Sequence, residues 1–482
     1  MNSKIVIAEF ASILSQLKQL SFIRQSVVLL TPKTKSRMFR NYRSYYYNIL
    51  HLAFPLMLSQ AGQVVVQLAD SVMVGHVGTP ELAAASFASN LFYLVMMLGM
   101  GITFGLTPLV GQAFGRNQFR EVAIYFKNSL WLNFAFTIVL TSASWGVSYL
   151  MPYMGQPKEV VALAIPYFRV LSISMLPFLL FFTLKQFAEG LGNTHIAMMV
   201  TLTANALNIF LNYFLIFGKG GLPALGLLGA GYATLVARFA MPVMMALLLY
   251  SRGNFRKYLL FFPSVRSGTQ KMAELLKIGL PIGVQLVLEI IAFNFGGVMM
   301  GWLGAVPLAA HQVALGMATM TFMISNGIAM ATTVRVSNWM GAHRLREMRM
   351  AIEASRHLVL LFMGLSAVVF IVFRNILPVV FTPDKAVIHQ ASILLVVAAF
   401  FQVFDGLQVV SLGCLRGMAD VKYPMYMAGI SYLLIGIPVS YLFAFVLKFG
   451  PAGIWIGFLA GLASAGIFFY VRIRYNIRHI AK

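Results

Sequence analysis

Twelve long apolar blocks, separated by short polar stretches, constrain the fold of this chain more than any other feature. Each block is long enough to cross a hydrocarbon layer of about 30 Å as a helix. They lie at 52–74, 81–109, 121–150, 160–186, 195–217, 226–250, 274–303, 307–334, 347–377, 387–414, 421–447 and 450–471. Only 10% of the 482 residues are charged, far fewer than in a soluble domain. The sequence therefore predicts an all-α polytopic membrane protein with twelve transmembrane helices, and it lacks the short alternating segments of a β-barrel.

The net charge is +23, and the lysine and arginine residues lie mainly between the apolar blocks. In a soluble protein it would suggest nucleic-acid binding, but here orientation in the membrane explains it better. Alternate loops are basic, and we assign to them Arg116 and Arg120, Lys185, the stretch 252–271, 344–349 and 416–422. The opposite loops contain few basic residues. The positive-inside rule then places both termini in the cytoplasm.

The two halves of the chain repeat each other at a constant offset of 226 positions, as between Pro55 and Pro281. At the same offset Gly75 aligns with Gly301, "LAA" with "LAA", and an Arg-Glu pair with an Arg-Glu pair. Because each repeat holds six helices, both enter the membrane in the same sense, as in transporters that work by alternating access. A duplicated channel subunit is the weaker alternative, since no re-entrant filter segment is visible.

This repeat sets the expected domain organisation. We predict a basic cytoplasmic leader at 1–45, an N-terminal six-helix lobe at 46–250, a cytoplasmic linker at 251–273, a C-terminal six-helix lobe at 274–475 and a cytoplasmic tail at 476–482. The leader reads as amphipathic or loosely ordered.

The sequence contains none of the catalytic or metal-binding motifs that we looked for. The single cysteine, Cys414, excludes an intrachain disulfide or a cysteine-based metal site. No zinc-protease or P-loop signature occurs. We expect neither an enzyme nor a bound cofactor.

Three acidic residues fall well inside the predicted spans: Asp70, Glu289 and Asp405. Each would cost about 2.5–3.5 kcal/mol if it faced lipid, so such residues normally face a bundle interior or a wet cavity. The alternative is a neutral, hydrogen-bonded acid that only joins helices. Glu289 aligns with Gln63 and Asp70 with Gly296, so the halves differ in their ion chemistry.

Polar side chains accompany these acids on single helix faces, at helical spacing. The positions are Gln63 and Gln67 before Asp70, then Asn205, Asn208 and Asn212, then Gln285 before Glu289, and Gln402 and Gln408 around Asp405. Polar faces on membrane helices must point at protein or water. Interhelical hydrogen bonding would explain one such residue, but several stripes with acids favour a hydrated cavity. His311 is expected to be a hydrogen-bonded structural residue.

Four stretches resemble the multidrug and toxic compound extrusion (MATE) family, especially its NorM-type branch: "LADSVMVGHVGTPELAAAS", "PLVGQAFGRNQ", "LEIIAFNFGGVMMGWLGAVPLAAHQVAL" and "FDGLQVVSLGCLRGMAD". The similarity covers about residues 45–475. It implies two six-helix lobes around a cleft, and export of amphiphilic, often cationic compounds in exchange for sodium ions or protons.

The resemblance also implies roles for individual residues. Asp70 matches the first-helix acid of the N-terminal lobe, and Glu289 and Asp405 match the paired acids of the C-terminal lobe. Asn208 and Asn212 match polar positions of the fifth helix, and Thr234 a hydroxyl of the sixth. Phe401 departs from relatives that carry a tyrosine near the cation.

These observations lead to one expected mechanism. A monomeric antiporter in the bacterial inner membrane exports organic compounds, with sodium possible as the bound metal at Asp70 or at Glu289 and Asp405. Sodium needs several oxygen ligands and a proton needs one acid, so the residues leave both ions open. A flippase for a lipid-linked precursor is the alternative within transport, and a membrane-embedded enzyme is the alternative outside it.

Overall fold

The computed structural model describes residues 32–221, 223–262, 264–265 and 267–480. Contacts divide the chain into two units, Met1–Asn48 and Ile49–Lys482. Most of the predicted leader, residues 1–31, lies outside the described residues, and the first described helix begins at Pro32.

Twelve helices in the described part are long and apolar enough to cross a membrane, as the sequence predicts. The first six spans are α3 (Pro32–Gly75), α4 (Thr79–Phe104) with α5 (Leu106–Gly115), α6 (Phe119–Leu150), α7 (Lys158–Gly190), α8 (His195–Phe217) and α9 (Leu227–Ser251). The last six are α11 (Thr269–Leu303), α12 (Ala305–Gly341), α13 (Leu345–Val372), α14 (Lys385–Gly417), the broken span from α15 (Lys422–Gly429) through η3 (Ile430–Gly436), α16 (Ile437–Tyr441) and η4 (Leu442–Val446), and α17 (Pro451–Ile480). Every regular secondary-structure element among the described residues is a helix.

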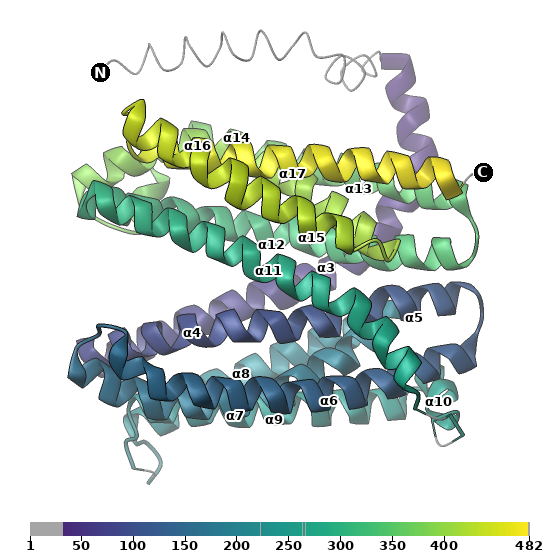
Figure 1. Ribbon diagram of the computed structural model, residues 1–482, viewed down its shortest axis with the longest axis horizontal. Helices are drawn as coiled ribbons and strands as arrows, with labels where there is room; N and C mark the ends of the chain where they lie inside the picture. Colours follow the sequence, from purple (N-terminus) through teal and green to yellow (C-terminus); the bar gives the residue numbers. More distant parts are fainter. Residues whose placement is uncertain (1–31, 222, 263, 266, 481–482) are drawn as a thin grey trace. The chain divides into compact units, whose positions relative to one another are not determined.

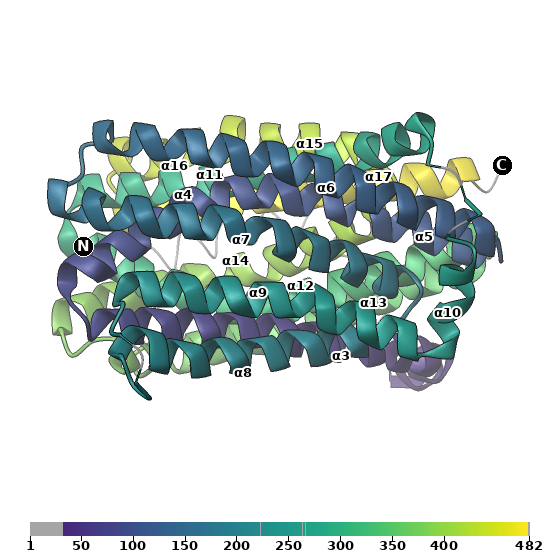
Figure 2. The same ribbon diagram turned by 90° about the horizontal axis from the view of Figure 1, so that it is seen from below.

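The spans form two groups that follow the sequence repeat. Figure 1 shows α4 to α9 together in one layer, and α12 to α17 together in the other. Within the first group α7 packs on α4, α6 and α9, and within the second α14 packs on α12, α13 and α17. In both views most of the long helices run side by side along one direction, while α11 crosses obliquely between the two groups in Figure 1 (Figures 1 and 2). This arrangement confirms two six-helix lobes.

Backbone geometry at the helix ends repeats with the sequence. Asn117 follows α5 at φ 59°, and His343 follows α12 at φ 55°. Both residues occupy the left-handed region, which costs a non-glycine residue free energy. The two positions differ by the same 226 residues as the aligned prolines, so the duplication extends to strained turns.

Among the described helix pairs, the crossings of α4 with α11 and of α5 with α12 make the largest contacts between the lobes. At the crossing of α4 and α11, a Cβ atom built on Gly101 would lie 2.1 Å from the Gly283 backbone. At the crossing of α5 and α12, a Cβ atom on Gly341 would lie 2.1 Å from the Gln112 carbonyl oxygen. Only glycine permits such backbone approach. We call the α5–α12 crossing the seam; it lies at the ends of the spans that the charge pattern assigns to the cytoplasm.

The predicted linker packs against the N-terminal lobe. It contains α10 (Gly253–Leu260), in which Phe255 and Tyr258 are buried. The Lys127 ammonium of α6 donates to the carbonyl oxygens of Phe262 and Val265 at 2.9 and 2.8 Å. The second lobe therefore starts from a chain segment that is held on the first lobe.

Candidate functional site

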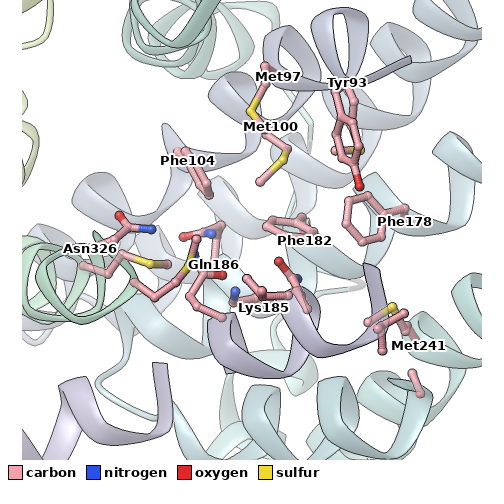
Figure 3. Close-up of a pocket in the computed structure, with 18 of the residues that line it drawn as sticks. Tyr93, Met97, Met100, Phe104, Phe178, Phe182, Lys185, Gln186, Met241 and Asn326 are labelled. Atoms are coloured by element: carbon pink, nitrogen blue, oxygen red, sulfur yellow. The ribbon is translucent and has the colours of Figure 1, made fainter. Parts of the chain in front are cut away.

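A cavity of about 420 Å³ lies between the lobes. Helices α3, α4, α7, α8 and α9 supply most of its wall, and α5, α11, α12 and α14 supply the rest. Figure 3 shows Tyr93 and Phe178 close together, with Asn326 of α12 on the opposite side of the view. The volume falls within the range of pockets that hold drug-sized molecules.

Methionine and phenylalanine make up much of the cavity wall. These side chains are Met96, Met97, Met100, Met241, Met323, Met330, Phe104, Phe178, Phe182 and Phe322. Methionine is flexible and polarisable, so it repacks around ligands of different shape. Sequence reasoning could not distinguish this use from ordinary membrane-core packing, because only the fold brings these residues to one surface.

The predicted polar residues divide between the cavity wall and the layer behind it. The wall contains Gln63, Gln67, Asn205, Asn208 and Thr234. The other four, Asn212, Gln285, Gln402 and Gln408, are buried outside it. The side-chain amide of Gln408 donates to the Tyr432 hydroxyl at 2.8 Å, so this residue joins α14 to the span beginning at α15.

None of the three predicted acids contributes to the described wall of this cavity. The expectation that they face one shared opening is therefore not met. Asp70 accepts a hydrogen bond from Asn212 of its own lobe, and Glu289 and Asp405 lie near each other in the other lobe. Their role in ion coupling stays a prediction.

Asp70 lies behind the cavity wall and is connected to it by hydrogen-bonded asparagines. Its Oδ1 accepts from the Asn212 amide at 2.5 Å, and that amide nitrogen also lies 3.2 Å from Asn208 Oδ1. Asn208, which lines the cavity, lies 3.3 Å from the Thr234 hydroxyl. Exchanging the oxygen and nitrogen of the Asn208 amide would let it donate directly to Asp70 at 3.1 Å. The first arrangement links Asp70 to the cavity through Asn212 and Asn208, and the second links it through Asn208 alone.

The amide oxygen of Asn212 is buried and has no hydrogen-bond partner among the described atoms. A buried acceptor without a partner is costly. A cation at Asp70 would supply one, and so would a proton on the carboxylate. The residues therefore fit a cation as transported cargo, although no group of three histidine, cysteine, aspartate or glutamate side chains that could hold a metal occurs among the described residues.

The acids of the C-terminal lobe form a second cluster. Glu289 of α11 and Asp405 of α14 lie close enough for their charges to interact, and Tyr432 lies near both. Asp405 is 4% exposed. Arg416 connects this cluster to the cavity, since it lines the wall and interacts electrostatically with Glu289. It also donates to Gln285 Oε1 at 3.2 Å.

Four charged side chains in the cavity wall were missed or misplaced by the sequence analysis: Lys185, Glu189, Arg238 and Arg416. Lys185 and Arg416 were assigned to basic loops, which is wrong. Both lie inside long helices, α7 and α14, whose last turns extend beyond the apolar blocks. The charge could have indicated their position, because an ionisable residue at or near the end of an apolar block can still belong to the embedded helix.

His311 also differs from expectation. Both of its ring nitrogens are buried without a hydrogen-bond partner among the described atoms. The ring instead packs edge-on against Trp455, with centroids 5.8 Å apart. The prediction of a hydrogen-bonded histidine is therefore wrong.

Lys185 and Glu189 form an ion pair one helical turn apart, with 3.7 Å between Nζ and Oε1 and both side chains 2% exposed. Removing one partner from a buried pair leaves an uncompensated charge, which costs about 3–5 kcal/mol. We expect Lys185→Met to lower the thermal unfolding midpoint of the purified protein. Adding Glu189→Gln to that variant is expected to restore most of the loss, and equal midpoints for the single and double variants would show that the pair is not coupled.

Two repeated six-helix lobes around a drug-sized cavity define a polytopic membrane protein of the transporter class. The MatE family model matches residues 55–214 and 281–442, one match in each half. The chain is 31% identical over 437 residues to the probable multidrug resistance protein NorM of Agrobacterium fabrum, covering 89% of this chain and 93% of that protein. For the protein of the same name from Mesorhizobium japonicum the identity is 34% over 421 residues, covering 86% and 90%.

Solved structures agree on the fold. The eukaryotic MATE transporter AtDTX14 superposes with a TM-score of 0.80 at 21% identity, covering 91% of this chain and 98% of that one. An outward-facing multidrug resistance MATE family transporter gives 0.83 at 21% identity, covering 91% and 97%. The chain belongs to the MATE family, in its NorM-type branch.

Proposed function

We propose that this protein is a secondary antiporter that exports amphiphilic organic compounds, cationic ones included, in exchange for sodium ions or protons. The observation that carries the proposal is the hydrogen-bonded path from the cavity through Asn208 and Asn212 to Asp70, together with the unpartnered oxygen of Asn212. Cargo in the cavity and a cation at Asp70 would thus occupy neighbouring sites. The two NorM relatives described above carry the name probable multidrug resistance protein.

Alternating access requires the lobes to separate at one end while they close at the other. In this structure the glycine contacts of the seam hold the predicted cytoplasmic ends together. We therefore infer a state closed toward the cytoplasm. We place the protein in the bacterial inner membrane, since the NorM relatives named above are bacterial. The positive-inside rule assigns its basic loops, and with them both termini, to the cytoplasm.

A transport assay in reconstituted vesicles would identify the coupling ion. Vesicles loaded with a fluorescent amphiphile would be given an inward sodium gradient at equal pH, and separately a proton gradient without sodium. Antiport predicts faster dye export with one of the two gradients than with neither. Equal rates under all three conditions would contradict the proposed function.

A lipid-linked precursor flippase is the competing transport function. The wall of the cavity carries three basic side chains, but most of the remainder is apolar. This composition suits a compact amphiphile better than a large multiply charged headgroup.

A further inference from the structure

The cavity wall contains three basic side chains and one acidic side chain. The basic residues are Lys185, Arg238 and Arg416, and the acid is Glu189. The acid already pairs with Lys185, and Arg416 donates to Gln285 and interacts electrostatically with Glu289 of the second acidic cluster. The wall therefore has an excess of positive charge, and the question is which basic group is available to a ligand.

Arg238 of α9 is that group. One of its guanidinium nitrogens donates to the Ser174 hydroxyl at 2.7 Å, and no ion pair joins it to any residue in the described part of the chain. Asp70 is near enough for a Coulomb interaction but does not pair with it. A guanidinium has five N–H donors, so one serine leaves most of them for other acceptors.

Two aromatic rings fix the position of this guanidinium. It lies 5.0 Å from the ring centroid of Phe92 and 4.5 Å from that of Phe178. Such contacts hold a cation without neutralising it. Phe178 and Tyr93 also line the cavity (Figure 3), so a flat apolar surface adjoins the charged group.

A fixed, unpaired cation within a membrane protein is costly unless an anion is supplied. The matching ligand chemistry is a carboxylate, because the planar fork of arginine binds that group with two parallel hydrogen bonds. We propose that Arg238 forms an anion subsite in the cavity, and that the preferred cargo is an aromatic amphiphile with a carboxylate group. This inference rests on the proposed export function and narrows its substrate class.

The test compares a rhodamine dye that carries a free carboxylate with the methyl ester of the same dye. Binding would be measured by fluorescence polarisation with the full-length protein in lipid nanodiscs. We expect wild-type protein to bind the acid more tightly than the ester. Arg238→Gln should weaken binding of the acid by about tenfold to a hundredfold, as for loss of a charge-assisted hydrogen bond, and leave the ester unchanged or bound more tightly.

Two further variants separate a binding role from a structural one. Arg238→Lys keeps the charge but loses the fork, so it should retain part of the preference for the acid. Arg169 offers a matched control in the same lobe: it donates to Ser148 and lies over Trp145 and Tyr149, but it is outside the cavity wall. Arg169→Gln should leave the preference intact.

Wild-type protein that binds the two dyes equally would overturn the inference, whatever the variants do. So would an Arg238→Gln variant that loses the same factor for acid and ester. Vesicle transport is a separate readout: absence of gradient-driven export of either dye would contradict the proposed function, while the binding preference would still decide the subsite.

Discussion

Asp70→Asn is expected to abolish gradient-driven accumulation while leaving the protein folded. A tenfold ion gradient supplies about 1.4 kcal/mol for each exchanged monovalent ion, which supports about a tenfold substrate ratio across the membrane. Without the carboxylate the cation loses its charged ligand, so the ratio should fall to about one. The neutral amide preserves the shape and can still hydrogen-bond to Asn212, so stability should change little.

Dye accumulation in vesicles measures this effect. Glu159→Gln is a suitable control, because Glu159 is an exposed acid in the first turn of α7. Glu289→Gln and Asp405→Asn test the second cluster in the same way. If all three amide variants exported dye at the wild-type rate, the assignment of ion coupling to these acids would be wrong.

Gly341→Leu is expected to force the seam apart. The Cβ atom would meet the carbonyl oxygen of Gln112 at 2.1 Å, and a backbone oxygen inside a helix cannot move aside alone. Overpacking of this kind costs about 1–3 kcal/mol. Because the cost applies only while the seam is closed, it shifts the population toward the state open to the cytoplasm by about tenfold or more.

A cysteine introduced at Asn326 of the cavity wall, with Cys414→Ser, would report this change. The labelling rate with a membrane-impermeant maleimide applied from the cytoplasmic side should rise about tenfold in the Gly341→Leu protein. Gly364→Leu is the matched control, since a Cβ atom at Gly364 of α13 meets nothing within 4 Å. Unchanged labelling in the Gly341 variant would show that the seam does not gate the cavity.

Local sequence was enough to predict the spans and the repeat. A membrane helix satisfies its backbone hydrogen bonds within itself, so an apolar block of sufficient length indicates a span without knowledge of its neighbours. Proline positions do not reveal by themselves where a membrane helix breaks. Pro55, Pro177 and Pro281 lie inside continuous helices, while Pro108 follows the break between α4 and α5.

Helical spacing also identified the asparagines near Asp70 as one polar face, and the family resemblance pointed to Thr234 on the next helix. It could not separate Asn208, which lines the cavity, from Asn212, which is buried behind it. The two residues are one turn apart on the same helix. Only the tilt and packing of α8 against α9 and α3 decide which of them reaches the opening.

For the same reason the sequence did not show that Arg238 lines the cavity. Within α9 it is a single charge between Ala237 and Phe239, and one residue corresponds to a rotation of about 100° around the helix. The sequence by itself determined that twelve helices form, in two repeated sets, and that certain acids are embedded among them. Tertiary structure alone decided which charges share the cavity, because that depends on the faces that distant helices present to one another.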